Sequence, residues 1–198
     1  MEFPEVVLRL PGWVGAFVDG KGPAFASIEE RMRFVIELSR VNVERRTGGP
    51  FGAAVFERDS GRVVGVGVNL VESGKCSIAH AEMVAIAVAQ QAVGSYDLGA
   101  EGFVCHELVT STEPCAMCLG AIPWSGIRRV VCGARDEDAR AIGFDEGSKP
   151  ADWVGSLERR GIAVVRDVLR EQARRVLVKY KESGGVIYNA MGGDSTAG

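Results

Sequence analysis

The sequence predicts a single α/β domain, a three-layer α/β/α sandwich built on a five-stranded mixed sheet. Its 198 residues match the size of one ordinary domain. Apolar residues make up 46% and charged residues 25%, which is typical of a globular chain with a substantial core. Strand-like and helix-like segments alternate along most of the chain, so helices can cover both faces of one sheet. These three observations define the expected fold class.

Charge and hydropathy disfavour two broad classes of function. The chain has 23 Lys and Arg against 26 Asp and Glu, a formal net charge of −3, whereas nucleic-acid binding usually requires a basic surface. We therefore expect a small-molecule substrate and no nucleic-acid partner. No apolar run approaches the ~20 residues that span a bilayer, and the N-terminus lacks the basic region of a secretory signal. We expect a cytoplasmic protein without a membrane anchor.

Residues 1–26 predict an irregular N-terminal arm, because this stretch contains three prolines and no sustained hydrophobic period. The main domain is expected to run from residue 27 to 182 and to begin with a helix. Ser27 and Glu30 fit a capping box, and apolar residues then recur at helical spacing to about Glu44.

Two strands are expected next, over residues 51–56 and 62–68. The connecting residues 58–61 read Arg-Asp-Ser-Gly, the composition of a hairpin turn, so the two strands should be antiparallel. A helix rich in Ala, Met, Ile and Gln follows over residues 80–93, and Gly94 ends it.

The second half of the chain continues the alternation. A buried strand is expected over residues 104–110, and the sequence Ser-Thr-Glu-Pro at residues 111–114 signals the start of a helix. The remaining elements are expected as strand 127–132, helix 153–160, strand 162–165 and helix 168–181, an order that predicts a parallel pair of strands. The tail, residues 183–198, is Gly-rich but contains Val-Ile-Tyr at 186–188. We expect this tail to be able to close over an active site.

The chemistry concentrates at Cys115 and Cys118, three residues apart at the head of the helix that follows strand 104–110. Their side chains share one helix face, close enough for both thiolates to bind one ion. The N-terminal end of a helix also favours ionised sulfur. A strand followed by C-x-x-C is equally the setting of thioredoxin-like redox motifs, so this pair alone leaves metal binding and dithiol redox chemistry open.

His80 and Glu82 favour the metal. His80 opens the preceding helix, and one His with two Cys fills three positions of a tetrahedral zinc site while leaving the fourth to water. Zinc lowers the pKa of such a water towards ~7, and a carboxylate near it can move its proton. We expect one zinc ion per chain on His80, Cys115 and Cys118, with Glu82 as the catalytic acid and base.

A fourth protein ligand would instead close the site into a structural zinc. Cys76, Cys105 and Cys132 are the candidates, although Cys105 and Cys132 fall on expected strands, where a lone Cys is usually a small buried apolar residue. His106 has no partner at metal-ligand spacing, so we expect a hydrogen-bonded or solvated strand histidine. Outside hydrolytic chemistry, a redox dithiol protein and a zinc-stabilised binding module remain alternatives.

The pattern H-x-E…P-C-x-x-C is the signature of zinc nucleobase deaminases. Together with residues 49–53 (GPFGA), Asn69 and residues 142–146 (IGFDE), it makes the chain resemble the cytidine deaminase superfamily, and within it the guanine deaminase branch of bacterial purine and triazine deaminases. The resemblance covers about residues 28–190. It implies a cytidine deaminase-like fold, a catalytic zinc ion and a homodimer.

The resemblance also implies roles for residues outside the zinc signature. Phe51 would stack on a flat ring and Asn69 would bind the polar edge of that ring. Ala81 belongs to the substrate-binding set. Glu146 would be a second catalytic carboxylate, near the departing amine.

The activity that the resemblance implies is hydrolysis of guanine to xanthine and ammonia, by an aminohydrolase of cyclic amidines. Ammeline or another aminotriazine, guanosine, cytosine, cytidine and tRNA adenosine are alternative substrates. A tRNA enzyme needs a basic groove for the anticodon arm, which the net charge of −3 disfavours.

Overall fold

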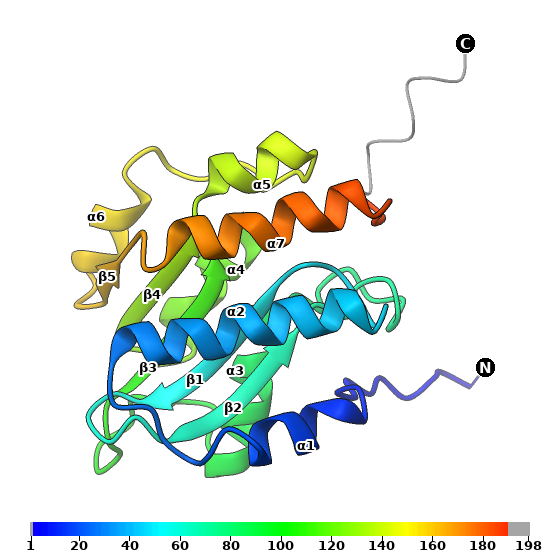
Figure 1. The fold of residues 1–198 in the computed structure, drawn as a ribbon. Helices are drawn as coiled ribbons and strands as arrows, with labels where there is room; N and C mark the ends of the chain where they lie inside the picture. The colour runs from blue at the N-terminus through cyan, green and yellow to red at the C-terminus, as the bar shows by residue number, and fades with distance from the viewer. Residues whose placement is uncertain (1, 190–198) are drawn as a thin grey trace.

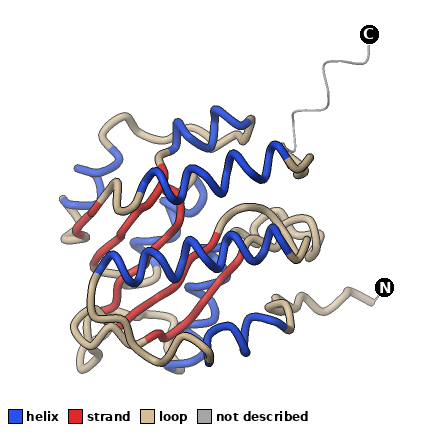
Figure 2. The backbone as a smooth tube through the Cα atoms, viewed as in Figure 1, coloured by secondary structure: helices blue, strands red, loops and turns tan. Residues whose placement is uncertain are grey.

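A five-stranded sheet forms the centre of the protein, with helices on both of its faces (Figure 1; Figure 2). The computed structural model describes residues 2–189. The strands are β1 (Gly52–Glu57), β2 (Val63–Val68), β3 (His106–Thr112), β4 (Arg129–Ala134) and β5 (Ala163–Val165), in the spatial order β2-β1-β3-β4-β5. β1 pairs antiparallel with β2 and β3, whereas β3, β4 and β5 are parallel. The predicted fold class, a three-layer α/β/α sandwich with a mixed sheet, is confirmed.

The helices are α1 (Trp13–Asp19), α2 (Ile28–Glu44), α3 (Ala81–Val93), α4 (Ala116–Trp124), α5 (Asp136–Ile142), α6 (Trp153–Glu158) and α7 (Arg170–Glu182). α2 and α7 lie side by side on one face of the sheet, and α3 and α4 lie on the other (Figure 1). Among the residues described, no helix is both long and apolar enough to span a bilayer.

Each face of the sheet has its own hydrophobic core, because successive residues of a strand point to opposite faces. Val109 of β3 and Val131 of β4 pack in the core that α2 and α7 cover. Their neighbours Leu108 and Val130 pack in the core beneath α3 and α4. The same strands therefore hold both helical layers.

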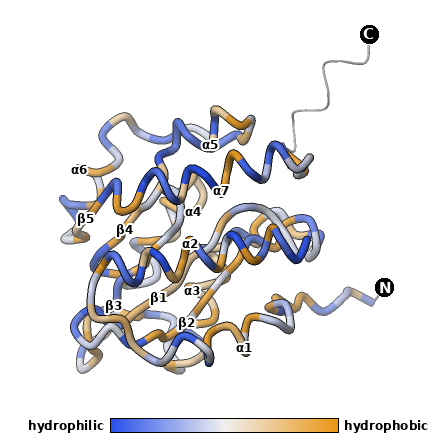
Figure 3. The backbone as a smooth tube through the Cα atoms, in the orientation of Figure 1, coloured by the Kyte–Doolittle hydropathy of each residue, from blue (hydrophilic) through white to orange (hydrophobic). Residues whose placement is uncertain are grey.

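α2 and α7 follow from local sequence signals. Ser27 Oγ accepts a hydrogen bond from the Glu30 backbone N–H at 3.1 Å, and the Glu30 carboxylate accepts one from the Ser27 N–H at 3.2 Å, so the capping box is confirmed. α7 is mostly polar, with Val176 and Leu177 buried against the core, and in Figure 3 its tube is blue with isolated orange positions. Such a single apolar stripe is what a surface helix needs.

α1 was not expected, because it lies in the stretch 1–26 that we predicted to be irregular. The Trp13 indole donates a hydrogen bond to Thr47 Oγ1 at 3.1 Å, and Phe17 packs on Phe34 of α2 with 5.5 Å between ring centroids. A helix of 7 residues is too short to show a periodic pattern or to be stable alone. Its packing on α2 therefore stabilises it, which no local signal reveals.

The acidic residues 136–138 form the first turn of α5, a helix that was not among the elements expected from the sequence. The Asp138 carboxylate accepts a hydrogen bond from the Arg135 backbone N–H at 2.8 Å. Acidic side chains stabilise the partial positive charge at the start of a helix. Gly143, with a φ of 112°, ends the helix in the left-handed region that favours glycine.

β3 begins later than the expected range of 104–110. Cys105 is exposed, so the prediction that it is a buried apolar residue is wrong: the strand starts only at His106. The strand continues through Ser111 although this side chain is polar, because Ser111 Oγ accepts a hydrogen bond from the Gly52 N–H at 3.1 Å.

β2 and α3 are in close contact at Gly67. A Cβ atom at this position would lie 2.1 Å from the Ala81 carbonyl oxygen and 2.5 Å from the Ala85 backbone nitrogen. Both obstructing atoms belong to the backbone, so they cannot move aside as a flexible side chain can. The absence of a side chain at Gly67 therefore fixes where α3 starts on the sheet.

We predict that Gly67→Ala lowers the free energy of unfolding by ~1–3 kcal/mol, because the added methyl group must displace the α3 backbone. Denaturant unfolding measures this. The matched control is Gly15→Ala in α1, where nothing lies within 4 Å of the added Cβ atom and the change should stabilise the helix by about 0.5–1 kcal/mol. Equal stability of the two variants would contradict the prediction.

Candidate active site

A pocket of about 470 Å³ opens at one end of the sheet, a size typical of small-molecule sites. Because β1 runs antiparallel to β3, the residue before β1 and the residues after β3 meet at this end, where ligands of open α/β sheets usually bind. Segments after β2 and α5 and the chain after α7 complete its wall. The lining side chains include Phe51, Asn69, His80, Glu82, Cys115, Phe144, Glu146 and Tyr188.

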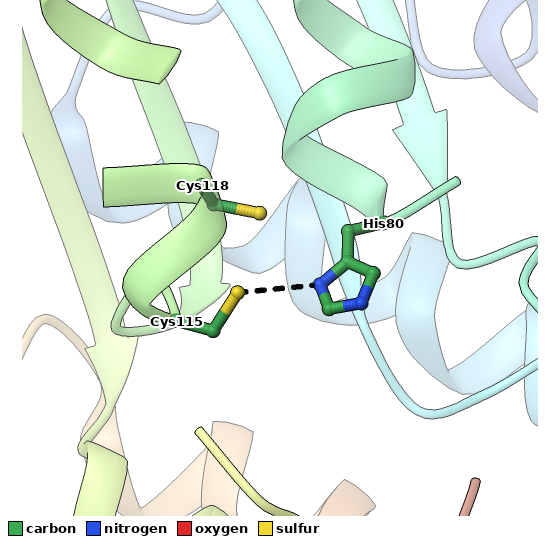
Figure 4. A group of neighbouring side chains, drawn as sticks. All are labelled: His80, Cys115 and Cys118. Carbon is green, nitrogen blue, oxygen red and sulfur yellow. Dashed lines mark hydrogen bonds between the residues drawn. The ribbon is translucent and has the colours of Figure 1, made fainter. Parts of the chain in front are cut away.

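Three metal-ligating side chains meet beside this pocket. His80 is the N-cap residue of α3 and Cys115 that of α4, both with extended backbone, and Cys118 lies in the first turn of α4. Their ligand atoms all lie within 4.8 Å of one another, and Cys115 Sγ is 3.4 Å from His80 Nδ1. Figure 4 shows both thiols of α4 directed towards the imidazole at the start of α3.

The three groups perturb each other's protonation. A hydrogen bond from the Cys118 thiol is the main reason that the pKa of Cys115 falls to about 4, whereas the same bond and burial raise the pKa of Cys118. Burial lowers the pKa of His80, but its hydrogen bond with Cys115 and the charge of that thiolate outweigh burial, so the net shift is upward. Metal ions bind the thiolate form of cysteine, so the lowered pKa makes Cys115 a good metal ligand.

The donor set fits zinc, which takes imidazole nitrogen and thiolate sulfur in tetrahedral geometry. Among residues 2–189, no fourth Cys, His, Asp or Glu joins the group. Cys132 is buried on β4, Cys105 is exposed, and Cys76 lies in the segment between β2 and α3. His106 is a buried strand residue whose Nδ1 lies 2.7 Å from the Leu98 carbonyl oxygen, the hydrogen-bonded histidine that we expected.

Glu82 lies in the first turn of α3 and is only 5% exposed. Thr110 of β3 donates a hydrogen bond to one carboxylate oxygen at 3.0 Å, and the other oxygen lies 3.5 Å from Cys118 Sγ. Burial raises the pKa of the carboxyl, and the negative charge of Cys115 acts in the same direction. The carboxyl group is thus held next to the metal-ligating atoms by a contact from the sheet.

Glu146 is a second buried carboxyl group, 6% exposed, in the loop after α5. Its backbone carbonyl accepts a hydrogen bond from the Ala116 N–H at 2.9 Å, which ties this loop to the start of α4. Burial is the largest cause that raises the pKa of Glu146 to about 8, with further contributions from the charges of Cys115 and Glu82.

The remaining wall is suited to a flat ring with a polar edge. Phe51 packs edge-to-face against Phe144, with 5.0 Å between ring centroids. Asn69 is fully buried and its amide nitrogen donates a hydrogen bond to the Tyr188 hydroxyl at 2.6 Å. Its amide oxygen accepts a weaker one from the Val71 N–H at 3.3 Å.

Most of the site residues that we expected from the sequence meet in this pocket, and Ala81 does not contribute a side chain to it. The Ala81 methyl group is fully buried in the core beneath α3 and α4. A contact between Ala81 and a substrate would have to come from its backbone.

Sequence reasoning missed three residues. Tyr188 and Phe144 line the pocket, and Thr110 supports Glu82. Tyr188 belongs to the apolar triplet noted in the tail, of which residues 190–198 lie outside the described part of the chain. Thr110 lies among other polar residues of β3, so no signal in the sequence singled it out.

Comparison with known proteins points to the same chemistry. A family model described as the cytidine and deoxycytidylate deaminase zinc-binding region matches residues 26–134. The guanine deaminase of Bacillus subtilis is 36% identical over 130 residues, which cover 63% of this chain and 79% of that protein. A solved structure of a guanine deaminase from Nitrosomonas europaea is 46% identical with a TM-score of 0.85, covering 91% of this chain and 100% of that one. Another, in complex with 2,6-diaminopurine, is 48% identical with a TM-score of 0.87, covering 94% and 97%.

An α/β/α sandwich that places one His and two Cys at helix N-termini, next to a buried Glu, defines the zinc-dependent deaminases of ring amines. These are hydrolases of C–N bonds. The chain belongs to the cytidine and deoxycytidylate deaminase family, and its fold is the cytidine deaminase-like fold of its structural neighbours.

We predict that Cys118→Ser weakens zinc binding by more than the ~10–100-fold that loss of an outer-shell partner costs, because it removes a ligand itself. Elemental analysis should find about one zinc per chain in the unmodified protein and a large loss in this variant. Cys132→Ser is the matched control, because Cys132 is equally buried but lies outside the ligand group. Full zinc content in Cys118→Ser would show that the ligand set is wrong.

Proposed function

We propose that this deaminase converts guanine and water into xanthine and ammonia. The observation that carries the proposal is the combination, in one pocket beside the metal-ligating group, of two buried carboxyl groups with one buried amide: Glu82, Glu146 and Asn69. The similarity to guanine deaminases over most of the chain supports it.

Glu82 is the proposed proton carrier of the reaction. Bound zinc supplies Lewis acidity, which makes a water nucleophilic at neutral pH. Glu82 takes a proton from the attacking water and delivers it to the ring nitrogen next to the carbon that bears the amine. Thr110 holds one oxygen of this carboxylate, so the other is oriented towards the metal ligands.

Glu146 is the proposed second carboxyl group, which helps a proton reach the amine as the C–N bond breaks. The amine then leaves as neutral ammonia and the ring carbon keeps the oxygen of the water. The pKa of about 8 that burial and neighbouring charges give Glu146 lets it hold a proton near neutral pH.

Phe51 and Asn69 are the proposed ring-binding residues. An aromatic side chain at the pocket wall can stack on a planar heterocycle. The Asn69 amide can donate to a carbonyl oxygen and accept from a ring N–H, which suits the O6 and N7 edge of guanine when the 2-amino group faces the zinc. A bound ring edge would take over the hydrogen bond that Asn69 now gives to Tyr188. Adenine presents the opposite pattern at this edge.

We also propose a homodimer and a cytoplasmic location, on separate grounds. The family resemblance implies the homodimer, and Trp124 of α4, which is 86% exposed, is an apolar side chain that such a contact could bury. All five cysteines are free thiols, which is usual in a reducing compartment.

Glu82→Gln should retain zinc and lose turnover by at least ~10²-fold, the lower end of what a positioned proton carrier contributes. Glutamine keeps the shape and the contact with Thr110 but cannot carry the proton. Zinc content and kcat are measured on the same sample. The control is Glu29→Gln, an exposed glutamate that also lies in a first helical turn. Near-normal turnover of zinc-loaded Glu82→Gln would remove Glu82 from the mechanism.

Among candidate substrates, guanine should have the highest kcat/KM. Adenine should be rejected by up to ~10⁴-fold, because its edge would leave buried polar groups without partners. An ammonia-release assay with guanine, guanosine, ammeline, cytosine, cytidine, adenine and an anticodon stem-loop measures this, with Glu82→Gln as the blank. A kcat/KM well above that of guanine for any other substrate would refute the proposed specificity and leave the deaminase class intact.

A further inference from the structure

Asp136, the first residue of α5, lies between two cationic side chains behind the pocket. One of its carboxylate oxygens accepts a hydrogen bond from Arg140 Nε at 2.5 Å. The other lies 2.7 Å from Lys149 Nζ. A single carboxylate, that of Asp136, therefore contacts both cations.

Lys149 connects this group to the metal-ligating turn. Its ammonium donates a hydrogen bond to the Pro114 carbonyl oxygen at 3.1 Å, and Pro114 directly precedes Cys115. The Lys149 side chain is only 7% exposed and its ammonium lies 5.4 Å from the centre of the Trp153 ring. Burying an ammonium is costly unless its partners are well placed, so this side chain has little freedom to move away from Pro114.

Arg140 connects the same group to the loop that carries Glu146. Its Nη2 donates a hydrogen bond to the Gly147 carbonyl oxygen at 2.8 Å, and Gly147 directly follows Glu146. Gly147 has a φ of 69°, and a Cβ atom on it would lie 3.0 Å from the Ala116 side chain. The loop therefore lies directly against the start of α4 at this point.

The loop between α5 and α6 has no regular secondary structure of its own. Two hydrogen bonds hold it at and just before Glu146: the Glu146 carbonyl accepts from the Ala116 N–H, and the Asp145 N–H donates to Asn189 Oδ1 at 3.0 Å. Neither bond lies after Glu146, and the bond from Arg140 to the Gly147 carbonyl holds the loop on that side. This bond is a charge-assisted hydrogen bond, and the ion pair of Arg140 with Asp136 orients the guanidinium that makes it.

We propose that Asp136, Arg140 and Lys149 act as positioning residues that set the Glu146 carboxyl group relative to Cys115. Arg140 holds the loop directly after Glu146, and Lys149 holds the turn directly before Cys115. This inference rests on the proposed catalytic role of Glu146. Loss of one cation should misplace the carboxyl group without removing any group that contacts the substrate. Displacements of about 1 Å can cost ~10²-fold in rate, so the effect should appear in kcat.

The first test compares Arg140→Met with Arg174→Met. Both arginines are exposed to a similar degree, 43% and 44%, and each pairs with an acid on its own helix, so both variants should fold. Arg140→Met should lower kcat by ~10-fold or more with KM changed less than about twofold, as for loss of an interaction made in the transition state. Arg174→Met should leave both constants unchanged. Equal kcat in the two variants would overturn the proposal.

The second test asks whether Arg140 acts through Glu146. In the Glu146→Gln background, Arg140→Met should have no further effect on kcat, because the group that it positions is gone. Independent, multiplicative effects would overturn the proposal. If Glu146→Gln alone keeps full turnover, the proposed role of Glu146 fails, whereas impaired Glu146→Gln with normal Arg140→Met refutes the positioning alone.

The third test reads the metal side of the arrangement without turnover. Lys149→Met should shift the visible absorption of the cobalt(II)-substituted protein, because the Pro114–Cys115 turn loses its support, while one metal ion per chain is retained. Lys179→Met is the matched control, since Lys179 forms an exposed ion pair with Glu44. Identical spectra of the two variants would overturn the role assigned to Lys149, and Arg140→Met remains decisive if Lys149→Met does not fold.

Discussion

The structure depends on one constraint: the N-terminal ends of α3 and α4 must bring an imidazole and two thiols to a single point. α3 follows β2 and α4 follows β3, and these two strands flank β1 in the sheet. Two strand spacings are about 10 Å, which matches the 8–10 Å between packed helices. Gly67 then lets α3 approach the sheet closely enough for His80 to reach Cys115. The positive ends of both helices favour the ionised sulfur that results.

Local chemistry made much of this predictable from the sequence. The capping box at Ser27 predicted the start of α2, and the alternation of elements predicted the mixed sheet. The metal-ligating group was equally accessible, because Cys115 and Cys118 are near neighbours and the chain has only two histidines. The expected irregular arm was wrong in part, and α5 was not expected: α1 and α5 are short helices that packing and capping stabilise, and neither produces a periodic pattern.

What the sequence could not reveal are contacts between distant segments. Asn69 and Tyr188 are 119 positions apart, yet they form one hydrogen bond across the pocket. Glu82 depends on Thr110 and the Pro114 carbonyl on Lys149, and no spacing rule links these residues. The side chain of Ala81 points into the core because of how α3 packs on the sheet, and this packing too is a contact between distant segments. Positions that support a site from behind are therefore visible only once the fold is known.

The acids on the two sides of the Glu146 loop have pKa values that are shifted in opposite directions. Within the pocket, two thiols and two carboxyl groups share a buried space, so they cannot all ionise without a cation; burial and the charge of Cys115 raise the pKa of Glu146 to about 8. Behind the pocket, burial also raises the pKa of Asp136, but the hydrogen bond from Arg140 and the close contact with the Lys149 ammonium outweigh it and hold the net pKa below its usual value. Acids whose environments shift their pKa values in opposite directions are suited to different tasks. Asp136 is suited to hold two cations as a carboxylate, and Glu146, for which burial outweighs the charge of Lys149, is suited to carry a proton.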